Sequence, residues 1–258
     1  MASNKREREL ARMRAERQAA RRAAAEARRR QQRNTVVIAI TAIAVVGVIA
    51  AIAIIAGTGK SNKSSVTSAF GNLGGTGTCS YTKAGNAAKK LAGTPPTTRI
   101  ANTGTNKVTF ETSQGEIKAD LLTGKAPCTI NSFAFLAQQN YFDNTPCHRL
   151  TTAGIFVLQC GDPTGSGSGG PGYQYADENL TGATYPKGTL AMANAGAGTN
   201  GSQFFLVYKD TQLPASYTPF GTITSGLDVV QKVADQGAKG GSDGTPNLAI
   251  KLKSVTFS

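Results

Sequence analysis

The chain has 258 residues, of which 40% are hydrophobic and 30 are glycine, and it contains no tryptophan. This composition is typical of turn-rich globular structure and argues against disorder over the whole chain. The formal net charge is +13, but residues 1–33 hold 12 lysines and arginines against 4 glutamates. The basic excess therefore belongs mainly to an N-terminal tail and is not a general property of the chain.

Residues 1–35 are predicted to form this basic, cytoplasmic tail. Alanine, arginine, glutamate and glutamine favour helix, but no apolar stripe could pack against a core. We expect a solvated helix or coil that can contact anionic lipid headgroups, at about 1 kcal/mol for each basic residue near the surface. Aromatic residues do not alternate with the charges, so no nucleic-acid partner is expected.

Val36 to Ala56 is an apolar run of 21 residues without a charge. As a helix it would span roughly 30 Å, the thickness of a bilayer core, so a single transmembrane helix is predicted. A cleaved secretory signal is the alternative, but its apolar region is usually shorter. The arginines before the run place the N-terminus in the cytoplasm, which predicts a single-pass protein of the cell membrane with the rest of the chain outside.

Residues 57–106 are rich in glycine, serine, threonine, asparagine and lysine, and they show no sustained periodicity. This composition is typical of a flexible linker. We therefore expect the segment to tether the following domain to the membrane.

From residue 107 the pattern changes to short segments that alternate apolar and polar side chains, as strands with one buried face do. About eight strands are expected, over residues 107–112, 116–122, 147–150, 155–160, 189–193, 203–208, 219–223 and 248–257. Helices are expected over 129–140 and 227–235, because apolar residues recur on one face of each. This mainly β pattern favours a closed antiparallel barrel over residues 107–258, and a two-sheet sandwich is the alternative.

Residues 192–205 (MANAGAGTNGSQFF) combine glycines with polar residues and two adjacent phenylalanines. Gly196, Gly198 and Gly201 allow backbone conformations closed to other residues, so main-chain groups of residues 193–195 can approach a ligand closely. The stretch is interpreted as a substrate-binding wall, although a glycine-rich hairpin without a ligand has the same pattern.

Arg149 is the only arginine after residue 99, and it follows the only histidine, His148. Side chains of one parity share a face in paired strands, so Arg149 could lie beside Gln159 and an apolar wall. On position alone, a solvated surface arginine is the alternative. For His148 we expect a buried, hydrogen-bonded core position and not the role of a base in a Ser–His–Asp triad.

Several motifs, in this order along the chain, resemble those of the cyclophilin peptidyl-prolyl isomerases. They are Cys147-His148-Arg149, Phe156 to Asp162, the glycine-rich loop 163–170, Asp177-Glu178, residues 192–196, residues 200–205 and Phe220-Gly221. The resemblance covers about residues 107–258. With the basic tail, one span and exported cysteines, the layout is similar to that of the membrane-anchored cyclophilins of actinobacteria.

The resemblance implies a cyclophilin-like barrel that isomerises X–Pro bonds in exported polypeptides and needs no metal or cofactor. It implies that the guanidinium of Arg149 is catalytic, that Gln159 orients it and that the main chain of Asn194 holds the peptide. The other residues implied in substrate binding are Phe156, Val157, Ala193, Ala195, Gln203, Phe205, Leu213 and Tyr217.

The chain also departs from the family's pattern. Val157 stands where a methionine is common, Leu213 where a tryptophan or phenylalanine often contributes, and Tyr217 where a histidine is common. We therefore expect weaker cyclosporin binding. A proline-peptide-binding chaperone or scaffold module with little turnover is the alternative function, because the pocket lacks the usual aromatic residue.

The four cysteines, Cys79, Cys128, Cys147 and Cys160, lie in the part predicted to be exported, where disulfides are stable. Two disulfides are expected, with three possible connectivities. Strand parity places Cys147 outside the barrel and Cys160 inside, which argues against a bridge between them. The pairing of Cys128 with Cys147 and of Cys79 with Cys160 is therefore favoured, and free buried thiols are the alternative.

Two other motifs are given structural interpretations. The loop 165–170 (GSGSGG) lacks the lysine of a phosphate-binding P-loop, and no helical pattern follows it. We expect it to form a mobile rim of the peptide groove. The pair Asp177-Glu178 is interpreted as part of a structural turn and not as a metal site.

Overall fold

The computed structural model describes residues 75–258. The predicted tail 1–35, the predicted span 36–56 and residues 57–74 of the predicted linker lie outside the described residues. Within residues 75–258, no helix combines the length and the apolar character needed to cross a membrane.

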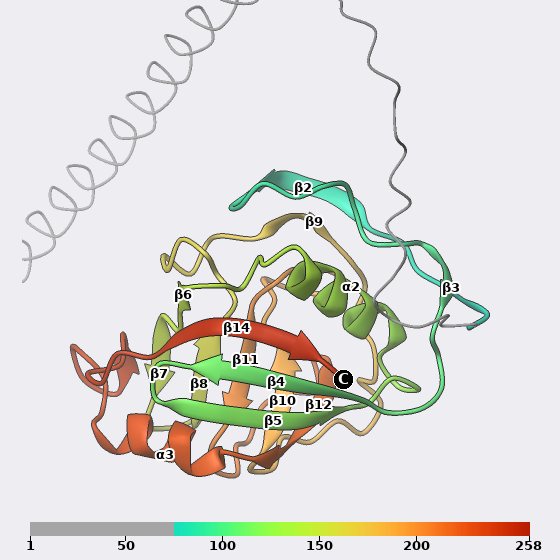
Figure 1. Cartoon of the computed structure of the whole chain (residues 1–258). Helices are drawn as coiled ribbons and strands as arrows, with labels where there is room; N and C mark the ends of the chain where they lie inside the picture. The colour runs from blue at the N-terminus through green and yellow to red at the C-terminus, as the bar shows by residue number, and fades with distance from the viewer. Residues whose placement is uncertain (1–74) are drawn as a thin grey trace, which may run out of the picture. The chain divides into compact units, whose positions relative to one another are not determined.

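A strongly curled antiparallel sheet dominates the described part of the chain (Figure 1). Its strands are β4 (Asn106–Thr112), β5 (Gly115–Leu121), β6 (Thr145–Pro146), β7 (Arg149–Thr151), β8 (Val157–Cys160), β10 (Thr189–Met192), β11 (Phe204–Val207), β12 (Pro219–Ser225), β13 (Asp243–Gly244) and β14 (Lys251–Phe257). Their order in the sheet is β13-β7-β8-β11-β10-β12-β5-β4-β14-β6.

The mainly β class and the two expected helices are confirmed, but the predicted closed barrel of eight strands differs from the structure. The sheet has ten strands, and the outermost two, β13 and β6, do not pair with each other. Both are only two residues long, too short for an alternating pattern to reveal them.

Two helices pack against this sheet, α2 (Pro127–Gln138) and α3 (Leu227–Asp235). Figure 1 shows α2 beside β14 and α3 beside β5. Pro127 suits the start of α2 because its fixed φ matches the first helical turn. On α3, the fully buried Val230 and Val233 face the sheet.

The inward side chains of the sheet form an apolar core with an aromatic centre. On β4, Phe110 is 1% exposed, and Phe133 of α2 is equally buried. The Phe133 ring meets those of Phe142, Phe204 and Phe220 at centroid distances of 4.7, 5.1 and 5.3 Å. The helix therefore closes the core through a residue of the face that the sequence periodicity identified.

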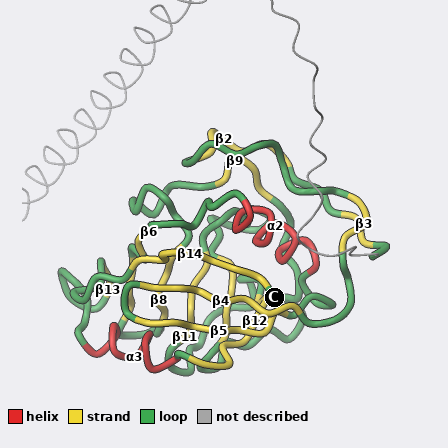
Figure 2. The backbone as a smooth tube through the Cα atoms, viewed as in Figure 1, coloured by secondary structure: helices red, strands yellow, loops and turns green. Residues whose placement is uncertain are grey.

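Residues 75–106, which we expected to belong to a flexible linker, pack on this domain instead. They carry β1 (Gly77–Thr78), β2 (Thr82–Ala87) and β3 (Thr98–Ile100), separated by loops (Figure 2). β1 pairs with β3, and β2 pairs with β9 (Pro171–Gln174). Its strands are short and mostly exposed, so their sequence shows no sustained alternation of apolar and polar residues.

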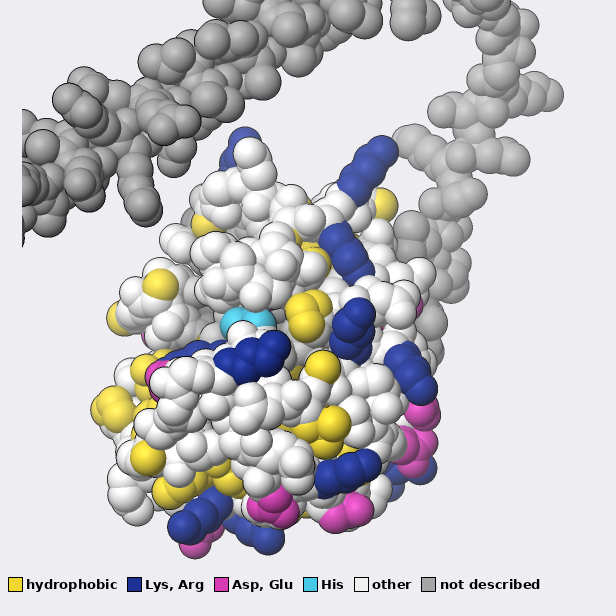
Figure 3. Space-filling model, turned by 90° about the vertical axis from the view of Figure 1, so that its left-hand side faces the viewer, with side chains coloured by type: hydrophobic (Ala, Val, Ile, Leu, Met, Phe, Trp, Pro, Cys, Tyr) yellow, Lys and Arg dark blue, Asp and Glu magenta, His cyan; other side chains and the backbone are white. Residues whose placement is uncertain are grey.

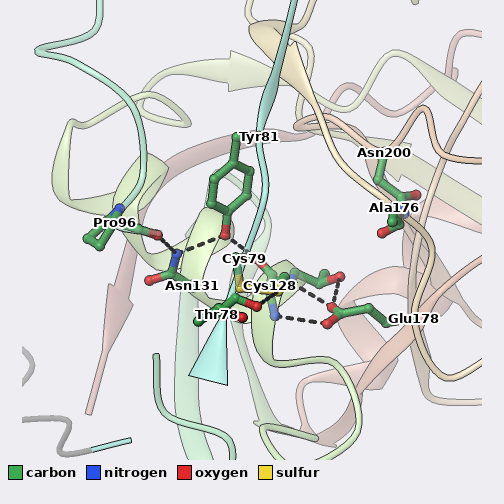
Figure 4. Close-up of a disulfide and its surroundings, with 10 residues drawn as sticks. Thr78, Cys79, Tyr81, Pro96, Cys128, Asn131, Ala176, Glu178 and Asn200 are labelled. Carbon is green, nitrogen blue, oxygen red and sulfur yellow. Dashed lines mark hydrogen bonds between the residues drawn. A yellow bond between two sulfur atoms is a disulfide. The ribbon is translucent and has the colours of Figure 1, made fainter. Parts of the chain in front are cut away.

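A disulfide between Cys79 and Cys128 fastens this segment to the first turn of α2 (Figure 4). Beside it, the Tyr81 hydroxyl donates to the Cys128 carbonyl at 2.8 Å. The carboxylate of Glu178 accepts from the N–H groups of Cys128 at 3.0 Å and Thr129 at 2.8 Å. Glu178 thus caps α2, where the helix dipole favours a negative charge.

The second disulfide joins Cys147 to Cys160, so the favoured pairing of Cys128 with Cys147 and of Cys79 with Cys160 is wrong. The parity argument failed because Cys147 precedes the first residue of β7, where strand alternation no longer fixes the direction of a side chain. Both cysteines are buried, at 3% and 0% exposure.

Candidate active site

Arg149 begins β7 and lies directly opposite Gln159 on β8. The Nη1 atom of Arg149 donates a hydrogen bond to Oε1 of Gln159 at 3.2 Å. Gln159 is in turn opposite Phe205 on β11, so the three side chains share the face of the sheet that points away from the core. Because neighbouring strands are about 4.8 Å apart, this row places an arginine within roughly 10 Å of an apolar residue.

Gln203 extends the polar part of this row. Its Oε1 accepts a hydrogen bond from Nε2 of Gln159 at 2.8 Å. Its own Nε2 donates to the carbonyl oxygens of Gly167 and Gly169, both at 2.9 Å. A continuous path of hydrogen bonds therefore runs from Arg149 through two glutamines to the glycine-rich loop.

That loop is organised around Asp162, which is fully buried. Its carboxylate accepts from the N–H groups of Thr164 and Gly167 at 2.7 Å and of Gly169 at 3.1 Å. Burial raises the pKa of Asp162, but hydrogen bonds from Thr164, Gly169 and Gly167 together lower it by more. The pKa of Asp162 therefore lies below its ordinary value. The loop is thus held at both its amide and its carbonyl groups, unlike the mobile rim that we expected.

An apolar cluster covers the outer face of β8, β10 and β11. Its buried members are Val157, Tyr185, Ala191, Phe205 and Val207, and the partly buried residues packed on it are Ile155, Ala183, Ala193, Leu213 and Tyr217. The rings of Phe205 and Tyr217 meet edge to face with centroids 5.6 Å apart. The structure therefore brings together five residues implied in substrate binding, namely Val157, Ala193, Phe205, Leu213 and Tyr217.

Phe156 lies outside this cluster, although we expected it in the same pocket. It packs against the main core cluster, and its ring meets that of Tyr208 at 6.0 Å. The Nζ atom of Lys209 lies 4.4 Å from the ring centroid. Phe156 precedes the first residue of β8, so strand alternation alone does not fix the direction of its side chain.

The main chain just after β10 was expected to hold the peptide through residues 193–195, and one of its N–H groups is available to do so. The N–H of Ala193 donates to the Gln203 carbonyl, and the N–H of Ala195 donates to the Thr199 hydroxyl. Within residues 75–258, no hydrogen bond uses the N–H of Asn194, whose side chain instead binds the Ser216 carbonyl at 2.8 Å. Asn194 therefore presents its main chain while its side chain anchors the turn.

Asp243 on β13 joins the site and was not identified from the sequence. Its Oδ1 accepts from Nε of Arg149 at 2.8 Å, and its Oδ2 accepts from Nη2 at 2.7 Å. This hydrogen-bonded ion pair raises the pKa of Arg149 and lowers that of Asp243. Asp243 comes from a glycine-rich stretch (GGSDG) 94 residues away in the chain, where no local pattern reports such a contact.

His148 lies beside the glycine-rich loop, since a Cβ added at Gly167 would lie 3.6 Å from its Cδ2 atom. Figure 3 shows the face that carries this single histidine, coloured cyan, with dark-blue basic side chains nearby. Both ring nitrogens are buried, but neither makes a hydrogen bond within the described residues, in contrast to the expected hydrogen-bonded position. Burial lowers the pKa of His148, and the nearby side chains of Asp162 and Gln203 oppose part of this shift.

The chain matches known proteins over the part that forms this site. Residues 107–257 match the family model of cyclophilin type peptidyl-prolyl cis-trans isomerases. Over 200 residues the chain is 46% identical to a probable peptidyl-prolyl cis-trans isomerase B of Mycobacterium tuberculosis, covering 71% of this chain and 64% of that protein. Over 193 residues it is 45% identical to the Mycobacterium leprae protein of the same name, covering 69% and 65%. The chain thus spans less than two thirds of the length of these relatives.

Solved structures show the same likeness. A cyclophilin type peptidyl-prolyl cis-trans isomerase of Cryptosporidium parvum, crystallised in the presence of the dipeptide Ala-Pro, has a TM-score of 0.54 and 30% identity. That match covers 59% of this chain and 98% of the crystallised one. The family model covers more than half of the chain, and the chain therefore belongs to the cyclophilin family.

Proposed function

We propose that this protein catalyses the cis–trans isomerisation of X–Pro peptide bonds in exported polypeptides and so assists their folding. The observation that carries the proposal is the row of Arg149, Gln159 and Phe205 on adjacent strands. This row places a hydrogen-bonded guanidinium beside an apolar surface. Membership of the cyclophilin family and the probable isomerases among the relatives support the same activity.

The barrier to be lowered arises in the peptide bond itself. Donation of the nitrogen lone pair gives that bond partial double-bond character, with a barrier of roughly 18–20 kcal/mol, and X–Pro bonds populate both isomers because cis and trans are close in energy. Rotation disrupts this donation and leaves a lone pair on a pyramidal prolyl nitrogen. A catalyst must therefore bind the twisted bond more tightly than the planar one.

The guanidinium of Arg149 can do so by donating a hydrogen bond to that nitrogen as the lone pair becomes available. The apolar cluster around Phe205 would receive the proline ring, exclude water and strengthen the interaction. The main-chain N–H of Asn194, which has no acceptor among residues 75–258, would hold one side of the bond while the other turns. The reaction forms and breaks no covalent bond, so it needs no nucleophile or general base.

Lysine is a poor substitute for arginine in this mechanism. The planar fork of Arg149 lets one nitrogen bind Gln159 while another faces the substrate, whereas an ammonium group is a point charge on a flexible stem. We assign Gln159 the role of orienting the guanidinium, and Gln203 that of holding Gln159 against the glycine-rich loop.

Catalysis can be tested with the full-length protein and a proline-containing tetrapeptide. The proposal predicts that substoichiometric protein accelerates cis–trans exchange, measured by NMR exchange spectroscopy. Binding of the peptide without any acceleration would contradict it and favour the proline-binding chaperone or scaffold, for which the aliphatic Leu213 in the pocket is the supporting observation.

We further propose that the uncharged run from Val36 to Ala56 anchors the protein in the cell membrane, with the isomerase domain outside and the basic tail on anionic lipids inside. Two disulfides in the described domain support an oxidising location. A carbonate wash of isolated membranes should leave the protein in the pellet. Recovery in the supernatant, or a mature chain that begins after Ala56, would contradict the anchor.

A further inference from the structure

The guanidinium of Arg149 is held from two sides. Asp243 binds Nε and Nη2 through its two carboxylate oxygens, and Gln159 binds Nη1. Of the five N–H bonds of the group, these contacts use three. The remaining two, one on Nη1 and one on Nη2, the terminal nitrogens of the fork, have no acceptor among residues 75–258.

The main chain around Asp243 is fixed by pairing with β7 and by a tight turn, so its carboxylate has a defined position beside Arg149. β13 pairs with β7 so that Asp243 is opposite Thr151, two residues after Arg149. The N–H of Thr152 donates to the Ser242 carbonyl at 2.8 Å. At Gly244 an added Cβ would lie 2.2 Å from the Lys239 carbonyl oxygen, so the tight turn of this segment requires glycine.

Folding stability does not account for the ion pair. The side chain of Asp243 is 55% exposed and that of Arg149 is 39% exposed. Ion pairs in such a setting contribute little to stability, because water screens the charges and both side chains lose freedom. Its two-point geometry instead fixes the plane and direction of the guanidinium.

We propose that Asp243 is a positioning residue that aims the terminal edge of the Arg149 guanidinium at the prolyl nitrogen. This inference rests on the proposed isomerase function. Without the carboxylate, the long arginine side chain is held only by Gln159 and samples other directions. A misplacement of about 1 Å can slow an enzyme by about a hundredfold, and we expect Asp243→Ala to lower kcat by about tenfold while peptide binding changes little.

The test is a double-mutant cycle in the full-length protein, with exchange rate and peptide affinity measured separately by NMR. Wild type, Asp243→Ala, Arg149→Ala and the double variant are compared. If Asp243 acts through Arg149, Asp243→Ala slows exchange when Arg149 is present and has no further effect when Arg149 is absent. Asp243→Glu, which restores the carboxylate, should recover part of the rate, and Asp243→Asn should recover less.

Glu116→Gln provides the matched control, because Glu116 forms an exposed ion pair of the same length, 2.7 Å, with Lys118 on β5. It should leave exchange unchanged. Wild-type exchange in Asp243→Ala, or equal losses with and without Arg149, would overturn the positioning role while leaving the isomerase proposal intact. Full activity of Arg149→Ala itself would instead overturn the assignment of Arg149, which separates the two failures.

Discussion

Cys147 and Cys160 form a disulfide that joins the residue two positions before Arg149 to the residue directly after Gln159. The bond therefore fixes the two chain segments whose side chains make the central hydrogen bond of the site. The disulfide therefore supports the residues that we propose as catalytic.

Replacing both of these cysteines by serine should lower both the stability of the protein and its rate of cis–trans exchange. The bond closes a loop with a sequence separation of 13, so its loss should lower the free energy of unfolding by about 3 kcal/mol. The exchange rate should also fall severalfold, because Arg149 and Gln159 lose a shared constraint. Denaturant unfolding and NMR exchange measure the two effects, and an unchanged rate would show that strand pairing alone sets the site.

The Cys79–Cys128 bond should behave differently. Its sequence separation of 49 predicts a larger loss of stability for the double serine variant, about 4 kcal/mol in the chain-entropy model. Since the bond fastens residues 75–106 to α2 and not to β7 or β8, the exchange rate should remain at its wild-type value below the unfolding transition. A large loss of rate in this variant would mean that the N-terminal segment shapes the site.

Asp162 should make the free energy of unfolding depend on pH in the acidic range. Its folded pKa lies below the ordinary 3.8, so its contribution is present above that value and is lost as pH falls through the folded pKa. Asp162→Asn should lower the free energy of unfolding by roughly 2–3 kcal/mol at neutral pH, because its amide would face the N–H groups of Gly167 and Gly169. The variant should lose this component of the acid dependence.

Denaturant unfolding between pH 3 and pH 7 checks the role of Asp162, with Asp120→Asn as the control. The side chain of Asp120 makes no hydrogen bond in the described part of the chain, so its replacement should have little effect. Equal acid dependence in wild type and in Asp162→Asn would show that the loop is not held by this carboxylate.

Much of the fold could be predicted from the sequence where periodicity is strong. The helix expected over 227–235 is α3, and the strand expected over 107–112 is β4 with one more residue. The placement of Arg149 beside Gln159 could be predicted from strand parity, and the part of Phe205 in the site was implied by the family resemblance. Phe156 precedes the first residue of β8, and its half-buried ring packs against the edge of the main core cluster.

The remaining features depend on contacts between distant parts of the chain. Asp243 reaches Arg149 across 94 residues, and residues 75–106 are held by a disulfide and by hydrogen bonds to α2 and β9, without a core of their own. The pairing of Cys147 with Cys160 was missed because alternation was extended beyond the end of a strand. Local patterns carry no information about these three features.

The central claim is that the Arg149 guanidinium binds the twisted X–Pro bond more tightly than the planar bond. The most direct test is NMR exchange of a saturating Ala-Pro peptide on full-length wild type, Arg149→Ala and Arg149→Lys. The account predicts similar peptide affinity in all three and a loss of exchange on the order of a hundredfold in both variants. Exchange at the wild-type rate in Arg149→Ala, with the peptide still bound, would contradict it.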